Sequence, residues 1–255
     1  MSAIRVENLT KRFGETVALD DVTFEIPDGE FTIVLGTSGS GKSTLLRCLN
    51  GLTSPTDGRV YVQGEPVSSP RRDVAMVFQQ HNIIEGMSAY SNALTGSLGR
   101  TEFLRSVLRF NDREDKIKAL DALETVGLLD EAEQRAGRMS GGQQQRVGVA
   151  RALVQEPNIL LADEPVASLD PASSQTVMGY LRGAAEERGL TTLISLHQVN
   201  LARQFGQRFI GLSDGELVFD GYRDELTFDI IDELYGGLDM EKLLSGERDI
   251  SEVVQ

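Results

Sequence analysis

The chain has 255 residues, 40% of them hydrophobic, which is enough for one large α/β domain or two small ones with an ordinary core. Its formal net charge of −14 argues against nucleic acid as the main partner, because contacts to phosphates require lysine and arginine. The chain has one cysteine, no signal-peptide pattern at its N-terminus and no apolar run near the ~20 residues of a membrane-spanning helix, so we expect a soluble protein of the reducing cytoplasm.

The predicted elements begin with strands. Residues 4–9 and 22–26 alternate apolar and polar side chains, as half-buried strands do, and they flank a turn at residues 13–15. Residues 31–36 are a continuous apolar run that ends in glycine, which is typical of a strand buried on both faces. In residues 43–52 leucines recur at helical spacing and a glycine follows as a stop signal, so we expect a helix there.

The pattern changes in the middle of the chain. Residues 59–64 and 73–79 are again predicted strands. From about residue 85 to residue 157 the strand pattern disappears and helical patterns dominate. This change predicts a helical subdomain that is inserted into an α/β core.

Strands return in the last third of the chain. Residues 158–165 and 191–197 are predicted as short apolar strands, and residues 208–221 as a hairpin with an Asp-Gly turn. Between the first two strands, residues 170–189 predict a helix with an aspartate cap, a proline in its first position and a glycine beyond its end. After residue 221 we expect a short, helical and acidic tail that runs to residue 255.

A glycine-rich segment joins the strand predicted at residues 31–36 to the helix that follows. It matches the pattern G-x-x-x-x-G-K-[ST], in which backbone N–H groups and the positive end of the helix surround phosphates. Its lysine reaches the β- and γ-phosphates, and its last hydroxyl is a ligand of Mg²⁺. The alternative, a plain glycine-rich turn, does not require this strand–loop–helix context. The expected nucleotide-binding residues are Gly36, Thr37, Ser38, Gly39, Ser40, Gly41, Lys42 and Ser43.

Two acidic residues end the predicted strand at residues 158–165. Asp163 follows a buried apolar run, where a carboxylate needs a partner such as Mg²⁺ and its waters. Glu164 is well placed to orient a water molecule on the γ-phosphate, so it is the candidate general base. The alternative, an ordinary exit from strand to loop, carries less weight beside a phosphate-binding loop.

The cysteine and the two histidines also have structural interpretations. Cys48 lies one turn into the predicted helix and is interpreted as a small buried hydrophobe. His81 has no clear partner and is interpreted as a surface histidine. His197 ends a predicted strand at the edge where α/β ligand sites form, so we favour a contact to the γ-phosphate over a structural role.

The segment MSGGQQQR at residues 139–146 predicts a second phosphate-binding loop. Ser140 and Gln143 fit a capping box at the start of a helix. A cap does not require Gly141 and Gly142, which each cost about 1 kcal/mol within a helix. Paired glycines with a capping serine form an anion cradle at a helix N-terminus. Because the chain has only one P-loop, we expect this cradle to close over a nucleotide that another copy holds.

Five motifs occur in the order found in the ATPases of ABC transporters: GTSGSGKST, MSGGQ, ILLADE, SLD and SLH. The chain resembles this family from about residue 3 to residue 236. The resemblance implies ATP as the substrate, Mg²⁺ as the cofactor, and a homodimer in which MSGGQ binds the γ-phosphate held by the partner's P-loop. It also implies transmembrane permease subunits as direct partners, an extracytoplasmic solute-binding protein as an indirect one, and a peripheral position on the cytoplasmic face of the membrane.

Individual residues take roles from this resemblance. Gln79 resembles the glutamine that senses Mg²⁺ and couples to the membrane subunit, Glu164 the catalytic base and His197 the switch histidine. Phe13 matches the aromatic residue that stacks on adenine, and a core aromatic in the N-terminal sheet is the alternative. The resemblance also implies metal contacts from Ser43, Gln79 and Asp163, a nucleotide contact from Thr44, and contacts to the partner's nucleotide from Ser140, Gly141, Gly142, Gln143 and Asp170.

The chain departs from the family pattern at two positions. Met139 replaces the usual leucine of the signature, which conserves volume and is expected to be harmless. Gln198 stands where most members have Glu or Asp after the switch histidine.

A narrower resemblance concerns the transported solute. The stretches NIIEGMSAYSNALTGSLGR, ADEPVASLDP and SLHQV are similar to the ATPase subunit of phosphonate importers, which implies phosphonate or a related phosphorus oxyanion as the solute. The alternatives are an importer of another solute, such as polar amino acids, and a non-transport ABC ATPase. The second alternative expects coiled-coil heptads, two ATPase domains or a basic surface, and the sequence has none of these.

The expected fold is an α/β P-loop ATPase core, a parallel sheet with helices, to which an N-terminal antiparallel β portion and the helical subdomain are added. Residues 1–236 are expected to form this domain and residues 237–255 an acidic tail. Five of the 25 basic residues are lysines. An acidic, lysine-poor surface is typical of proteins adapted to high salt, where screening relieves self-repulsion, and an ordinary acidic protein is the alternative.

Overall fold

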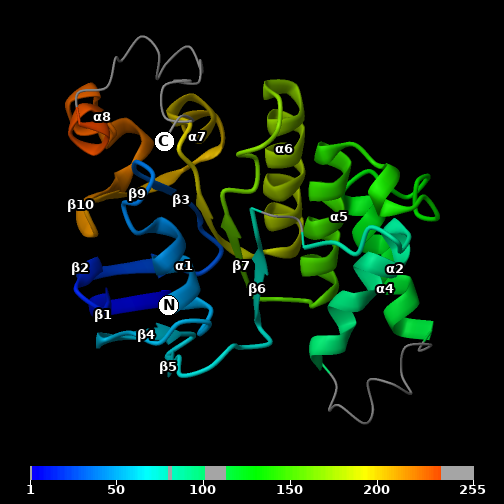
Figure 1. The fold of residues 1–255 in the computed structure, drawn as a ribbon, viewed down its shortest axis with the longest axis horizontal. Coiled ribbons are helices and arrows are strands. Elements are labelled where there is room, and N and C mark those ends of the chain that lie inside the picture. Colours follow the sequence, from blue (N-terminus) through cyan, green and yellow to red (C-terminus); the bar gives the residue numbers. More distant parts are fainter. Residues whose placement is uncertain (1, 80–81, 101–112, 237–255) are drawn as a thin grey trace.

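The computed structural model describes residues 2–79, 82–100 and 113–236. Within these residues the chain forms two β-sheets, with helices packed around the larger one (Figure 1). His81 and the acidic tail predicted at residues 237–255 lie outside the described residues.

The smaller sheet is antiparallel and has the strand order β2-β1-β4-β5. Alternate side chains of its strands are buried, because one face packs on helix α1 (Lys42–Leu49), as the alternating pattern predicted. Helix α1 shares a hydrophobic cluster with both sheets and lies between them. The strands are β1 (Ser2–Phe13), β2 (Thr16–Pro27), β4 (Asp57–Val62) and β5 (Glu65–Pro66).

The larger sheet has the order β10-β9-β3-β8-β7-β6, in which β10 is antiparallel to its neighbour and the other strands are parallel. Four of its strands, β3, β6, β7 and β8, are buried along their whole lengths. The carboxyl ends of these four strands meet at one edge, where α/β proteins bind ligands. The strands are β3 (Phe31–Leu35), β6 (Val74–Val77), β7 (Ile159–Asp163), β8 (Thr191–Ser195), β9 (Arg208–Ser213) and β10 (Glu216–Tyr222).

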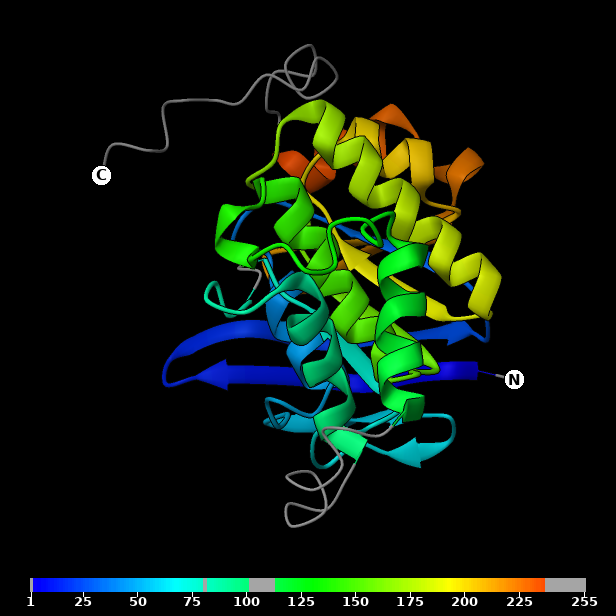
Figure 2. The same ribbon diagram turned by 90° about the vertical axis from the view of Figure 1, so that its right-hand side faces the viewer.

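The helices form a second cluster with the other face of this sheet. Helices α2 (Ala89–Leu94), α4 (Arg113–Thr125) and α5 (Gly141–Val154) pack on one another and make up the predicted helical region, beside α6 (Pro171–Arg188) and α7 (Val199–Phe205) (Figure 2). Helix α5 also packs on α6 and β6, so it joins this region to the core. None of the helices in the described ranges combines the length and the apolar composition of a membrane span.

Residues 222–236 contain a helix, as expected after residue 221, and this helix packs on the domain instead of forming part of a free tail. A 3₁₀ turn at Arg223–Glu225 is followed by helix α8 (Phe228–Tyr235), in which Ile231, Leu234 and Tyr235 are buried in the main core. The sequence analysis missed this packing because the segment is short and its acidic residues outnumber its core residues.

Candidate nucleotide-binding site

The loop between β3 and α1 is held in a shape that only glycine permits at two positions. Gly36 has a φ of 149°, and a Cβ there would lie 2.2 Å from the carbonyl oxygen of Leu212. Gly41 has a φ of 101°, and its Cβ would lie 2.5 Å from the carbonyl oxygen of Ala18 in β2. The loop therefore lies directly against backbone on two sides. Its last residues lead into α1, whose first N–H groups have no partner within the helix.

Lys42, at the start of α1, is only 4% exposed and folds back on this loop. Its Nζ donates to the carbonyl oxygens of Gly36 and Thr37, both at 2.8 Å, and lies 3.8 Å from a carboxylate oxygen of Glu164. Burial lowers the pKa of Lys42 below its ordinary value, while the charges of Glu164 and Asp163 oppose this effect. An anion that binds beside this ammonium group would oppose the effect of burial and stabilise the charged form.

Asp163, at the end of β7, is buried and accepts two hydrogen bonds on one carboxylate oxygen. The hydroxyl of Ser43 donates to Oδ1 at 2.8 Å and the hydroxyl of Ser195 at 3.0 Å. A carboxylate and a hydroxyl are oxygen ligands of the kind that Mg²⁺ takes together with phosphate oxygens and waters. Within the described ranges no three His, Cys, Asp or Glu side chains could hold a metal by themselves. The donor set therefore fits a magnesium ion that is shared with phosphates.

Glu164 begins the loop after β7 in the left-handed region of backbone conformation. Its φ is 44°, which is uncommon for a residue with a side chain, and its N–H donates to the Ser195 hydroxyl at 2.9 Å. One carboxylate oxygen lies 3.8 Å from Nζ of Lys42, and the other lies 3.8 Å from Nδ1 of His197. Three neighbouring strands, β3, β8 and β7, thus bring a lysine, a histidine and an acid together at their carboxyl ends.

The other residues predicted near the nucleotide lie at the margins of this group. Gln79 follows β6, the neighbour of β7, and its side chain is exposed. Phe13 ends β1 and is 53% exposed, so the alternative of a core aromatic is wrong. It pairs with the first residue of β2, two residues before Ala18, which contacts Gly41. Its ring is therefore free of the core.

Cys48 belongs to the hydrophobic cluster that α1 shares with both sheets. Its side chain is 1% exposed, which confirms the interpretation as a small buried hydrophobe. Burial raises the pKa of its thiol to about 11.

The start of α5 has the predicted capping box. The N–H of Gln143 bonds to Oγ of Ser140 at 3.3 Å, and the N–H of Ser140 donates to Oε1 of Gln143 at 2.9 Å. The two glycines also have a packing role that the sequence analysis missed. A Cβ on Gly141 would lie 3.3 Å from the Leu169 side chain, and one on Gly142 would lie 3.2 Å from Cβ of Ser173.

The capped start of α5 is separated from the phosphate-binding loop of the same chain. It lines a cavity of about 220 Å³ together with the first turns of α6. Strands β6 and β7 lie between α5 and α1, which follows the loop (Figures 1 and 2). The two predicted phosphate-binding segments therefore do not form one site within a single chain.

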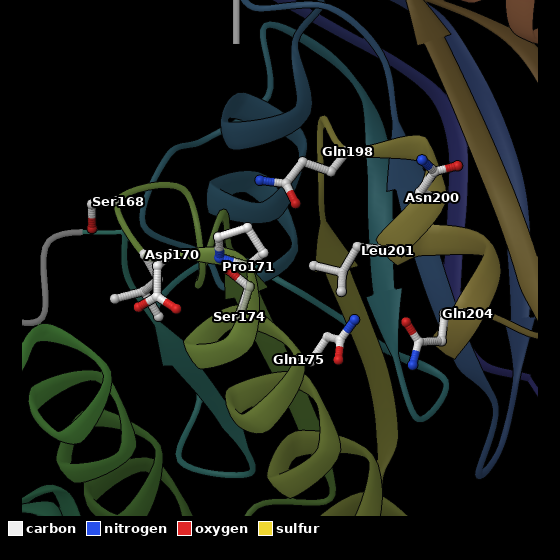
Figure 3. A pocket seen from close by; sticks show the side chains of 10 residues that line it. Ser168, Asp170, Pro171, Ser174, Gln175, Gln198, Asn200, Leu201 and Gln204 are labelled. Atoms are coloured by element: carbon white, nitrogen blue, oxygen red, sulfur yellow. The ribbon is translucent and has the colours of Figure 1, made fainter. Parts of the chain in front are cut away.

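A second cavity, of about 480 Å³, lies between the start of α6 and α7 (Figure 3). Asp170 caps α6 by accepting a hydrogen bond from the N–H of Ser173 at 3.0 Å. Hydrogen bonding with Ser173 lowers the pKa of the Asp170 carboxyl group. Gln198, which departs from the family pattern, precedes α7 and lines the cavity without capping that helix. The cavity joins the segment after Glu164 to the segment after His197.

Two residues that contact the site were not found from the sequence. Ser195 bridges the carboxylate of Asp163 and the N–H of Glu164, and its only local signal is a hydroxyl at the end of an apolar strand. Tyr235, in α8, donates its hydroxyl to the carbonyl oxygen of His197 at 3.0 Å. No local pattern indicates this contact, because 38 residues separate the two partners.

Comparisons with known proteins agree with this geometry. A family model described as ABC transporter matches residues 19–167. The chain is 67% identical to the phosphonates import ATP-binding protein PhnC of Halobacterium salinarum, over 97% of this chain and 88% of that protein. It is 56% identical to the phosphonates import ATP-binding protein PhnC 2 of Haloquadratum walsbyi, over 99% of this chain and 90% of that protein.

Two solved structures have a similar fold. One is a dimeric ATP-binding cassette in a post-hydrolysis state, bound to ADP and Pi, with a TM-score of 0.73, 35% identity and coverage of 86% of this chain and 98% of that one. The other is a nucleotide-free ATP-binding cassette from an ABC transporter, with a TM-score of 0.79, 26% identity and coverage of 97% and 100%.

Proposed function

This chain belongs to the ABC transporter family, and we propose that the importer it energises takes up phosphonate or a related phosphorus oxyanion. The chain is an ATP-hydrolysing subunit of a transporter. The proposal for the solute rests on the names of its relatives, two of which are 67% and 56% identical over nearly the whole chain.

The observation that carries the mechanism is the position of Glu164 between a buried lysine and a histidine, 3.8 Å from each. With ATP bound, Lys42 exchanges its two carbonyl partners for phosphate oxygens. The carboxylate of Glu164 accepts a proton from the water molecule whose oxygen bonds to the γ-phosphorus. The bond from that phosphorus to the bridging oxygen breaks, and ADP leaves with its electron pair. His197 contacts the γ-phosphate and keeps it oriented towards the acid.

Ser43 and Asp163 are the residues that would hold Mg²⁺, and Gln79 would reach it from the end of β6. The ion, when bound, neutralises charge on the phosphate oxygens. The hydrogen bonds from Ser43 and Ser195 to Asp163 keep the carboxylate in one orientation before the ion arrives. Backbone N–H groups of the loop and the first turn of α1, which includes Thr44, surround the phosphates, and Phe13 stacks on adenine.

The second phosphate-binding segment serves a nucleotide that the partner subunit holds. The dimeric cassette bound to ADP and Pi supports a homodimer, and the separation of α5 from the P-loop supports action between subunits. The residues proposed to contact the partner's nucleotide are Ser140, Gly141, Gly142, Gln143 and Asp170. The dimer would bind membrane permease subunits on the cytoplasmic face of the membrane, and a solute-binding protein would deliver the solute from outside.

Hydrolysis and solute are tested separately. The purified chain should hydrolyse MgATP, and Glu164→Gln should lower kcat about a hundredfold or more while ATP still binds, because the variant keeps the shape but loses the base. Glu187→Gln, at an exposed position of α6, is the matched control and should keep full activity. Near-normal turnover in Glu164→Gln would contradict the assignment of the base.

The solute is tested with the complete transporter in vesicles. With permease and solute-binding protein present, a phosphonate should stimulate ATP hydrolysis, whereas glutamate or another polar amino acid should not. Stimulation by the amino acid alone would identify an importer of another solute and leave the ATPase assignment intact.

A further inference from the structure

Helix α8 returns the end of the described chain to the nucleotide site. Thr227 caps the helix, and Ile231 and Leu234 bury its inner face. Leu234 lies so close to β9 that a Cβ on Gly211 would be 2.7 Å from its side chain. Strand β9 pairs with β3, which leads directly into the P-loop. The position of α8 is thereby fixed relative to the phosphate-binding loop.

The last residue of α8, Tyr235, contacts the segment that carries His197. Its side chain is 4% exposed, and its hydroxyl donates to the carbonyl oxygen of His197 at 3.0 Å. Burial raises the pKa of Tyr235 far above its ordinary value, the backbone of Gly36 nearby opposes the rise and the charge of Glu164 adds to it. The phenol therefore stays protonated and remains a donor at neutral pH.

The segment that carries His197 lies between the end of a strand and the start of a helix. The backbone pairing of this segment with β3 continues to Leu196, whose N–H donates to Val34, and α7 begins only at Val199. The imidazole itself is 38% exposed and lies 3.8 Å from a carboxylate oxygen of Glu164, so the position of the His197 backbone sets where the ring lies relative to that acid. The bond from Tyr235 fixes the backbone of His197 between these two elements.

We propose that Tyr235 is a positioning residue for ATP hydrolysis. Its hydroxyl bonds to the backbone of His197 and so holds the imidazole beside Glu164. The inference rests on the proposed function of that site, because it assigns to His197 a contact with the γ-phosphate. In this proposal Tyr235 acts through His197 and not directly on the substrate or the metal.

The first test separates turnover from binding. Tyr235→Phe keeps the buried ring and removes only the hydroxyl. We expect kcat for MgATP to fall about five- to tenfold, the effect of one lost hydrogen bond, and KM to stay within about twofold. Tyr222→Phe is the matched control, because it also removes a tyrosine hydroxyl, but from a side chain that is 53% exposed. Its kinetics should equal those of the wild type.

The second test asks whether the effect passes through His197. In a His197→Ala background, adding Tyr235→Phe should cause no further loss in single-turnover cleavage, because the group that it positions is absent. The chain has two histidines, so their imidazole NMR signals can be assigned with His81→Asn. Tyr235→Phe should shift the signal of His197 and leave that of His81 unchanged, and Tyr222→Phe should move neither.

The outcomes distinguish this inference from the proposed function. An unchanged kcat together with an unchanged His197 signal in Tyr235→Phe would overturn the positioning role, and so would full additivity with His197→Ala. If both Tyr235→Phe and Tyr235→Met fail to fold, the residue is structural and the inference is wrong. A wild-type chain that does not hydrolyse MgATP would overturn the proposed function, while the NMR signals would still test the contact.

Discussion

One residue directly after β7, Glu164, has a backbone conformation that costs free energy. Glu164 has a φ of 44°, which for a residue with a Cβ costs about 1–2 kcal/mol. The hydrogen bond from its N–H to Ser195 holds the backbone there. The conformation directs the carboxylate towards Lys42 and His197, so the cost serves the geometry of the site.

Two substitutions of Glu164 separate this strain from catalysis. Glu164→Gln keeps the strain and removes the charge, whereas Glu164→Gly removes both. We expect both variants to lose hydrolysis, but Glu164→Gly to be more stable than Glu164→Gln by about 0.5–1 kcal/mol, roughly 2 °C in Tm, because glycine adopts a positive φ readily. Thermal melting followed by circular dichroism measures the difference. Equal melting temperatures would show that the backbone is not strained there.

Cys48 should be chemically silent in the folded protein. Its thiol is buried and its pKa is raised to about 11, so the reactive thiolate is scarce at pH 8 and remains a minority species at pH 9. A chromogenic disulfide reagent should titrate no thiol in the native chain and one in guanidinium chloride. Glu187→Cys, at an exposed position, is the positive control and should react within minutes. Rapid reaction of the native wild type would contradict the burial.

At the scale of elements, the sequence predicted what local chemistry encodes. The Asp-Gly turn appears at Asp214 and Gly215 with positive φ at both, and Asp170 caps α6 as expected. The capping box of α5 was also predicted, but the close approach of its glycines to α6 was not. Nor was the packing of α8. Such contacts depend on which element, distant in the sequence, packs against the residue. The spacing of neighbouring residues does not determine this.

The separation of α5 from the P-loop leads to a mixing experiment. Ser140→Arg places a bulky cation where a partner's γ-phosphate would dock, and Lys42→Ala removes the charge from the chain's own phosphates. Each variant alone should fail to dimerise with ATP. In a mixed dimer, one site combines an intact P-loop from the Ser140→Arg chain with an intact signature from the Lys42→Ala chain. Mixing should therefore restore ATP-dependent dimers, measured by light scattering.

The control for this experiment is each variant mixed with itself at the same total concentration. Single-turnover cleavage should reappear only in the mixed sample, at one site per dimer. If both variants are folded and no dimer forms when they are mixed with ATP, the signature serves its own chain and the proposal of action between subunits is wrong.

At the scale of the whole molecule, the fold class was predicted and the strand order was not. The strands of the α/β core and the helical region follow from hydrophobic periodicity, whereas the antiparallel N-terminal sheet belongs to the fold that the resemblance to ABC-transporter ATPases implies. Periodicity identifies strands but does not state their neighbours. The position of β3 between β9 and β8 results from crossovers that bring together residues far apart in the chain. The site at the strand ends depends on this order.

The net charge of −14 predicts a response to salt. Screening shortens the Debye length from ~10 Å at 0.1 M to ~3 Å at 1 M, which relieves repulsion among acidic side chains. If the surface is adapted to high salt, Tm should rise clearly with KCl and exceed the rise in sucrose of equal osmotic strength. A Tm that stays flat or falls up to molar KCl would favour the ordinary acidic protein.

The central position of β3 also bears on how the protein is made. Ribosomes deliver the N-terminal sheet first, and its strands can pair at once because they are close in sequence. Strand β3 is fully buried in the folded protein but pairs with Thr191–Ser195 and Arg208–Ser213, which are synthesised much later. Until then its two edges have no native partner strand. A nascent chain stalled before β8 should therefore be a substrate for chaperones, and a truncated product that ends there should aggregate.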